Sequence, residues 1–310
     1  MQFFNKGTEI DLMGKRHLAI IFSGAMLLIS LGAIIFQGLN FGIDFTGGTL
    51  VEVKYPQAVE LSAVREALSK DGFSDAVVQH FGTSQEVLVR IAPRDDVASA
   101  VLSDRAFNAM QRVDSGADRR RVEFVGPQVG EELTEDGGLA MLYALFGILI
   151  YVGLRFEYRF AVGSVIALMH DVLITIGFFA LFQVEFDLPV LAAVLAVIGY
   201  SLNDTIVVFD RIRENFRKMR KGETVGIINL SINQTFSRTL ITSGTTLLVL
   251  IALFVFGGKI IHGFSLALIV GIVVGTYSSI YVASTSVISM GVSRADLMPV
   301  KKEDDLNDMP

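Results

Sequence analysis

Six stretches of the chain are long and apolar enough to cross a membrane. A membrane-spanning helix needs roughly 20 mostly apolar residues, and runs close to that length, with few or no charges, recur between polar segments. The first run is longer than the apolar core of a signal peptide and no A-x-A-like cleavage site follows it, so we interpret it as a retained anchor. The six runs are Leu18–Phe36, Leu139–Leu154, Phe160–Phe182, Leu188–Phe209, Thr239–Phe256 and Phe264–Val292.

The hydrophilic segment 37–138 predicts a small folded domain between the first two membrane helices. Strict alternation of apolar and polar residues marks half-buried strands, and apolar residues at helical spacing mark helices. The order of elements is strand, helix, strand, strand, helix, strand, with residues 82–86 as the hairpin turn. This order matches a ferredoxin-like α+β fold. The predicted elements are Leu50–Tyr55, Leu61–Leu68, Ala76–Phe81, Val87–Ala92, Val97–Val113 and Arg121–Val125.

Basic residues in the short connecting segments predict the orientation, because cytoplasmic loops carry an excess of Lys and Arg. Lys and Arg occur before the first run, after the second and after the fourth, whereas residues 183–187 hold none and residues 257–263 hold only Lys259. Both ends are therefore expected in the cytoplasm and the domain outside. The predicted division is residues 1–36 (cytoplasmic N-terminus and helix 1), 37–138 (periplasmic α+β domain), 139–292 (helices 2–6) and 293–310 (cytoplasmic tail).

Composition narrows the function classes. Hydrophobic residues make up 52% of the 310 residues and charged residues 19%, below the quarter or so that is usual for soluble domains. The chain has no Cys, which excludes disulfides, thiolate metal sites and a Cys nucleophile. Its net charge of −6 gives no basic field for nucleic acid. Neither a GxxxxGK[ST] loop nor a nucleophile elbow occurs, so an enzyme is the least favoured class.

Ionisable residues inside the apolar runs are the candidate functional residues, since each costs about 2.5–3.5 kcal/mol on membrane-insertion scales. His170 and Asp171 interrupt the third run, Asn203 and Asp204 the fourth, and Arg238 stands at the start of the fifth. Asp204 precedes the basic segment by roughly 10 Å of helix, so it and Arg238 are expected at similar depth with opposite charge. Ser201, Asp204 and Thr205 share one helical face. This arrangement is suited to a proton or ion path.

Each of these residues also has a structural interpretation that the pattern leaves open. Arg238 could extend to the membrane interface, or form a purely structural pair with Asp204. His170 is more typical of a hydrogen-bonded packing histidine than of a metal ligand, and Asp171 could anchor a helix interface. Small residues at four-residue spacing on the sixth run allow close helix packing, either within the chain or against a partner subunit; these are Gly271, Gly275, Ser279 and Ala283.

Five ordered motifs resemble those of the SecD/SecF family of the bacterial protein-export machinery. The resemblance extends over nearly the whole chain apart from the interior of the hydrophilic domain and the tail. The motifs are FGIDFTGGTLVEV (41–53), VGPQVGEEL (125–133), RFEYRFAVGSVIALMHDV (155–172), VIGYSLNDTIVVFDRIREN (197–215) and TFSRTLITSGTT (235–246).

The resemblance implies a resistance-nodulation-division architecture, in which one helix, an outer domain and five more helices form half of a twelve-helix unit. It implies SecD as the other half, with SecYEG, YajC, SecA and a translocating preprotein as partners in the bilayer of the bacterial inner membrane. The proton-motive force would drive export, with H⁺ as coupling ion and Na⁺ as the alternative, and without cofactor or metal. Asp204 and Arg238 match the proton-pathway positions; Asp171, Asn203, Thr205 and Thr239 are the expected supporting polar residues.

Without the resemblance, two rival functions remain. One is a half-size antiporter of small molecules and protons, which should carry a larger outer region with a substrate cleft. The other is a scaffold subunit whose outer domain only docks partners, and such a subunit would not need a membrane acid opposite an arginine. A translocation assay with and without an ion gradient separates these functions.

Overall fold

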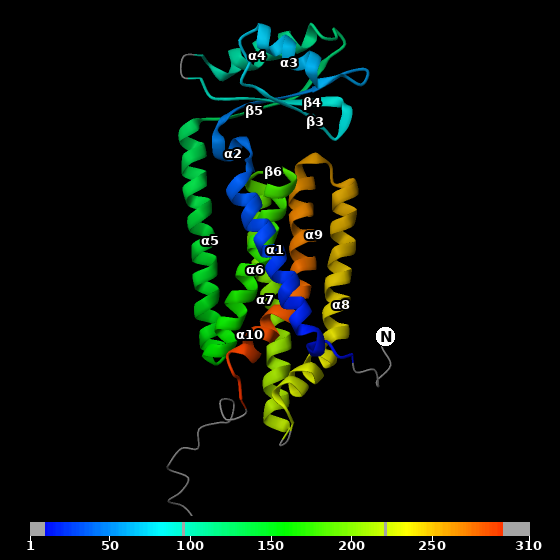
Figure 1. Ribbon diagram of the computed structural model, residues 1–310. Coiled ribbons are helices and arrows are strands. Elements are labelled where there is room, and N and C mark those ends of the chain that lie inside the picture. Colours follow the sequence, from blue (N-terminus) through cyan, green and yellow to red (C-terminus); the bar gives the residue numbers. More distant parts are fainter. Residues whose placement is uncertain (1–9, 95–96, 220–221, 294–310) are drawn as a thin grey trace, which may run out of the picture.

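All six apolar runs form helices in the computed structural model, which describes residues 10–94, 97–219 and 222–293, apart from the side chains of residues 259 and 260. The predicted ends 1–9 and 294–310, and the basic residues Arg220 and Lys221, lie outside the described residues. The helices stand side by side as a bundle with the α+β domain at one end (Figure 1). They are α1 (Arg16–Phe36), α5 (Pro127–Arg155), α6 (Tyr158–Phe182), α7 (Leu188–Lys218), α8 (Thr224–Phe256) and α9 (Lys259–Ser278), which continues through a π-helical turn (Ser279–Ala283) into α10 (Ser284–Ser289).

The hydrophilic segment folds as the predicted ferredoxin-like domain. Its sheet has the order β3-β4-β2-β5, with every neighbouring pair antiparallel. Both helices cover the face of the sheet that points away from the bundle (Figure 1). Apolar side chains of alternate strand positions, such as Val51, Val53 and Val89, pack there against Val64 and Leu68. The elements are β2 (Gly48–Lys54), α3 (Leu61–Lys70), β3 (Val77–Phe81), β4 (Thr83–Ile91), α4 (Ser99–Gln111) and β5 (Asp118–Val125).

The hairpin turn between β3 and β4 is shorter than predicted. Residues 83–86 belong to β4, where Glu86 pairs with Lys54 of β2. Gly82 alone turns the chain, with a φ of 82° that glycine adopts without strain. The expectation of a turn over residues 82–86 was wrong because Thr, Ser and Gln on an exposed strand end resemble turn residues.

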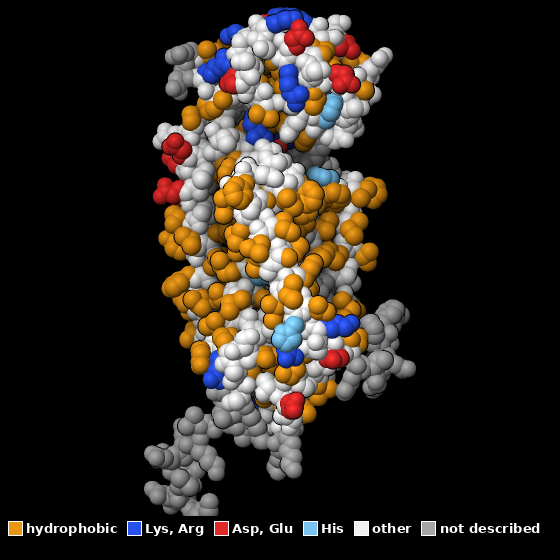
Figure 2. Space-filling model, in the orientation of Figure 1, with side chains coloured by type: hydrophobic (Ala, Val, Ile, Leu, Met, Phe, Trp, Pro, Cys, Tyr) orange, Lys and Arg blue, Asp and Glu red, His pale blue; other side chains and the backbone are white. Residues whose placement is uncertain are grey.

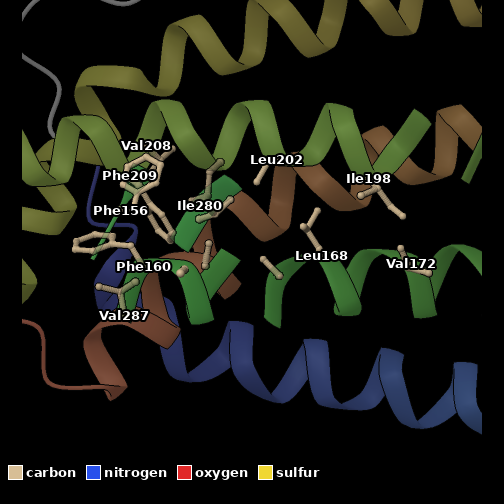
Figure 3. Close-up of a cluster of buried hydrophobic side chains, with 14 of the residues drawn as sticks. Phe156, Phe160, Leu168, Val172, Ile198, Leu202, Val208, Phe209, Ile280 and Val287 are labelled. Carbon is tan, nitrogen blue, oxygen red and sulfur yellow. The ribbon is translucent and has the colours of Figure 1, made fainter. Parts of the chain in front are cut away.

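The bundle packs tightly because α7 lies at its centre, against α6, α8 and α9. Phe160 of α6 and Phe209 of α7 meet edge to face, with ring centroids 5.0 Å apart (Figure 3). On α9, a Cβ at Gly271 would lie 2.1 Å from Val197, and a Cβ at Gly275 would lie 3.0 Å from Ser201. These small residues therefore let α9 approach α7 within the chain. The alternative of a seam with a partner subunit is wrong for this face.

Three helices extend far beyond their apolar runs. Helix α5 begins at Pro127 instead of residue 139 and so continues outside the apolar segment, with Pro in its first turn, where a missing N–H costs nothing. Helix α7 continues to Lys218, and α8 begins at Thr224. Arg238, expected at the start of its helix, therefore lies in the interior of α8.

The distribution of side chains fits a membrane protein. Hydrophobic side chains cover the middle of the bundle, and charged side chains gather on the α+β domain and at the opposite end (Figure 2). The α5–α6 connection and the C-terminal end of α7 lie at the same end as the start of α1, away from the domain (Figure 1). The basic segments of the described chain thus share one end, which is the relative arrangement that the predicted topology requires.

Candidate functional site

Asp204 lies in the interior of the bundle on the central helix. Helix α7 begins after Asp187, whose side chain accepts a 2.9 Å hydrogen bond from the Val190 amide. The helical repeat then places Ser201, Asp204 and Thr205 on one buried face, as predicted. Asp204 is only 3% exposed. Its Oδ2 accepts a hydrogen bond of 3.3 Å from the Ser243 hydroxyl of α8.

Asp171 of α6 forms a second buried carboxylate site. Its side chain is fully buried, and its Oδ2 accepts hydrogen bonds from Ser201 of α7 at 2.5 Å and from Ser278 of α9 at 2.6 Å. Its Oδ1 lies 2.9 Å from Nδ1 of the neighbouring His170. Two hydroxyls thus share one carboxyl oxygen, and the imidazole ring contacts the other. Asp171 thereby fastens α6, α7 and α9 at one point.

Hydroxyl groups connect the neighbourhoods of the two carboxylates. Thr276 of α9 forms a 2.8 Å hydrogen bond to Ser243, the donor to Asp204. Two residues later, Ser278 reaches Asp171, while Ser201 lies three residues before Asp204 on α7. A polar strip therefore runs across α6, α7, α8 and α9. It adjoins the π-helical turn Ser279–Ala283, a local irregularity that often occurs at functional sites.

Several buried hydroxyls beside this strip have unused hydrogen-bonding capacity. Among the described residues, the side-chain oxygens of Tyr200, Thr205 and Thr239 are buried without a hydrogen-bond partner. Buried polar groups are normally satisfied by protein or ordered water, and a polar, roomy site can hold water. The unpartnered oxygens of Thr205 and Thr239 therefore leave hydrogen-bonding capacity on the two helices that meet at Asp204 and Ser243.

Arg238 lies on the exposed side of α8 and does not contact the Asp204 carboxylate. Within the described residues, no ion pair within 4.0 Å joins these two side chains; Ser243 takes that place. Arg238 instead lines a cavity of about 330 Å³ between α7 and α8, at the end of the bundle away from the domain. Five residues, or about 7.5 Å of helix, separate Arg238 from Ser243. The other lining residues are Val207, Asp210, Arg211, Glu214, Gln234 and Thr235.

The structure thus separates the candidate residues into two groups. Asp171, Asp204, Thr205 and Thr239 are buried together in the bundle, whereas Asn203 is exposed on the outer face of α7. Thr242 and Thr245 of α8 are exposed as well. The two threonine hydroxyls donate to carbonyls of their own helix, whereas the exposed Asn203 amide is suited to a hydrogen bond with a protein partner.

Sequence reasoning missed Thr276 and Ser278. A hydroxyl in an apolar helix usually bonds its own backbone, so neither residue stands out, although the run Thr276–Ser279 is unusually polar for α9. No cluster of three or more metal-ligating side chains occurs in the part of the chain that the structure describes.

Comparison with known families connects this arrangement to protein export. Residues 106–293 match the model for "Protein export membrane protein SecD/SecF, C-terminal", and residues 32–59 match the SecD/SecF GG motif. The chain belongs to the SecD/SecF family. The family resemblance drawn from the five motifs is thereby confirmed.

Members of the SecD/SecF family resemble this chain along its whole length. The protein translocase subunit SecF of Vibrio alginolyticus is 54% identical, with 100% of this chain and 99% of the relative covered. SecF of Pseudomonas aeruginosa is 50% identical over 97% and 98%. The crystal structure of SecDF, a translocon-associated membrane protein from Thermus thermophilus, matches with a TM-score of 0.84 at 38% identity, covering 93% of this chain and 39% of that chain. The chain therefore spans about two fifths of that SecDF chain.

The GG motif of the SecD/SecF family has a clear structural reason in this chain. Gly47 and Gly48 have φ angles of 66° and 125°, in the region that favours glycine. A Cβ at Gly47 would lie 2.9 Å from the Cα of Pro127, where α5 begins, and a Cβ at Gly48 would lie 2.5 Å from the carbonyl oxygen of Ile91. The glycines thus allow the strand β2 to begin directly beside α5.

Proposed function

We propose that the chain is the SecF-type subunit of a bacterial preprotein translocase and uses an ion gradient to assist export. Family membership and the translocase names of its relatives support the subunit assignment. The use of an ion gradient is supported by the buried Asp204. Its carboxyl group is connected through Ser243 to Thr276 of α9, and the cavity lined by Arg238 lies between the same helices α7 and α8. Such a residue has no use in a passive scaffold.

Asp204 would take up and release the coupling ion, H⁺ in the first instance and Na⁺ as the alternative. Protonation removes the charge that Ser243 and the nearby Arg238 stabilise, and so changes which packing of α7 and α8 is favoured. One charge moved through the membrane potential supplies about 2.3 kcal/mol per 100 mV. This is enough to bias a two-state equilibrium by several tens of fold. No cofactor and no ATPase activity of its own enter this proposal.

A SecD-type partner would complete the membrane unit. The exposed Asn203 lies on α7 next to Asp204 in sequence, and the exposed Thr242 and Thr245 lie on α8, which also carries Arg238. A second set of helices would cover these side chains. The unit would work with SecYEG, YajC and the SecA ATPase in the bacterial inner membrane. Both ends of the chain would be cytoplasmic and the α+β domain periplasmic, where it contacts the emerging preprotein.

The test is preprotein translocation into vesicles that contain the assembled complex, measured with and without an ion gradient. Asp204→Asn should keep assembly with the partner and remove the gradient-dependent part of export. Asp136→Asn, at an exposed position of α5, is the matched control and should leave it unchanged. Equal gradient-driven export by wild type and a well-assembled Asp204→Asn complex would refute the proposal.

A further inference from the structure

The chain between α1 and β2 is tied to the connection between α6 and α7. The two-residue strand β1 (Asn40–Phe41) pairs in parallel with β6 (Glu185–Phe186), and the Gly42 amide donates a 2.8 Å hydrogen bond to the Phe186 carbonyl. The paired residues are 145 positions apart in sequence, and no local pattern predicts their pairing. We call β1, the short helix α2 (Ile43–Thr46) and β6 the joint.

Arg90 fixes the α+β domain to this joint. It projects from β4, and its guanidinium donates to Glu185 Oε1 at 2.9 Å and to the Phe41 carbonyl. The Arg90 and Glu185 side chains are only 12% and 23% exposed. An arginine bonded to a carboxylate and a carbonyl in such a partly buried place has charge-assisted bonds and a fixed geometry. Surface ion pairs, by contrast, restrain little.

Asp44 fixes the joint to the first turn of α7. Its Oδ2 accepts a 3.0 Å hydrogen bond from the amide of Leu188, the first residue of that helix. The first amides of a helix lack partners within the helix, and a carboxylate there also complements the helix dipole. Asp204 lies sixteen residues further along α7, or about 24 Å of helix. The α+β domain is therefore connected to the helix of the buried acid through two side chains.

We propose that Arg90 and Asp44 are positioning residues that make the α+β domain and α7 move as one body. Strand pairing, the Arg90 bonds and the Asp44 cap act on the same few residues, and the rings of Phe41, Phe45 and Phe186 pack edge to face or tilted beside them. Several contacts on the same residues are typical of a connection that stays closed. A contact that opens and closes during each round of export would need only one of them. Any displacement of α7 at Asp204 then moves the α+β domain by the same rigid-body motion.

The first measurement concerns the connection alone and does not depend on ion coupling. Since the chain has no Cys, spin labels can be placed at Glu66→Cys on α3 and Ala192→Cys on α7, both exposed positions. Their distance distribution in the assembled complex should be narrow in the parent and broad in Arg90→Ala and Glu185→Gln. Arg112→Ala, which breaks the exposed Arg112–Asp71 pair of the same domain, is the control and should stay narrow. A parent distribution as broad as those of the variants would overturn the rigid connection. Distributions of both joint variants as narrow as that of the parent would overturn it as well.

The second measurement, which rests on the proposed function, compares gradient-driven export of a urea-denatured secretory precursor. Arg90→Ala and Asp44→Asn should reduce the gradient-dependent part at least several-fold and leave the gradient-independent part unchanged. A disulfide can be formed between Gly42→Cys and Asp187→Cys, because a Cβ at Gly42 would lie 3.2 Å from the Asp187 Cβ, near the separation in disulfides. This disulfide should leave gradient-dependent export intact, because it fixes a connection that stays closed.

These outcomes separate failure of the joint from failure of the proposed function. Export that is lost on oxidation of the double-cysteine variant and restored on reduction shows a latch that must open, and overturns the proposal. Full gradient-driven export by an Arg90→Ala complex with a broad distance distribution overturns it too. A parent complex without any gradient-dependent export refutes the proposed function instead, while the distance measurement still decides on the connection.

Discussion

Ser278 of α9 donates a 2.6 Å hydrogen bond to the carboxyl group of Asp171 on α6. The two residues are 107 positions apart in sequence, and their hydrogen bond joins α6 to α9 in the interior of the bundle. Ser201 of α7 donates to the same oxygen. The carboxylate thus holds three helices together at a fully buried point. This arrangement gives Asp171 a structural role beside the ion-coupling role proposed for Asp204.

Ser278→Ala should destabilise the protein by about 1–3 kcal/mol, because it leaves a buried carboxyl oxygen short of one donor. Thermal unfolding of the purified protein in detergent measures the effect. Ser286→Ala is the control, since that hydroxyl bonds only the Val282 carbonyl of its own helical segment. A Ser278→Ala protein as stable as the control would show that Asp171 does not depend on this donor.

Arg238→Met should abolish gradient-dependent export in the assembled complex, because it removes the positive charge that stabilises ionised Asp204. Arg238→Lys should retain part of it, since the charge stays while the guanidinium geometry is lost. Translocation into vesicles with and without a gradient gives both values. If the methionine variant matches wild type, Arg238 acts only as an interfacial side chain.

Gly271→Ala should destabilise the bundle by about 1–3 kcal/mol, since overpacking of a close helix contact forces backbone shifts. The added Cβ would overlap Val197. Gly244→Ala in α8 has open space around it and should be neutral or slightly stabilising. Combining Gly271→Ala with Val197→Ala should recover much of the lost stability. If unfolding experiments show no such recovery, the close contact between Gly271 and Val197 is contradicted.

The buried carboxyls of Glu185 and Asp187 should contribute more to the stability of the folded protein in acid than at neutral pH. Burial is the main cause that raises the pKa of Glu185 and of Asp187; Arg90 opposes it for Glu185, while Asp44 and Glu123 add to it through their negative charge. A carboxyl whose pKa is raised on folding contributes stability that is present below its ordinary pKa and is lost as the pH rises through the folded value. The contribution of these carboxyls to the free energy of unfolding should therefore fall as the pH rises from about 5 to 8.

Glu185→Gln is the control for this pH dependence. It lacks the titrating group, so its free energy of unfolding, measured by denaturation in detergent, should change less with pH than that of the parent. A parent that gains stability relative to Glu185→Gln as the pH rises would contradict the sign of the effect.

Hydropathy and alternation were enough to predict the six helices and the ferredoxin-like order, because both depend on local periodicity. They failed for the start of α5, since the polar residues 127–138 form an exposed helix that no apolar run marks. They also failed for Thr276 and Ser278, whose partners lie on other helices. Asp204 and Asp171 could be found because an acidic residue in an apolar run is conspicuous. The β1–β6 pairing could not, because each strand has only two residues and its partner is distant in sequence.

Only Gly126 separates the last residue of β5, Val125, from Pro127 at the start of α5. The sheet therefore continues into a 29-residue helix without a flexible hinge segment. The domain is therefore held at two places, by α5 directly and by α7 through the joint, so that a tilt of either helix in the bilayer is resisted by the other. Motion that begins inside the membrane would move the domain only when both helices move together.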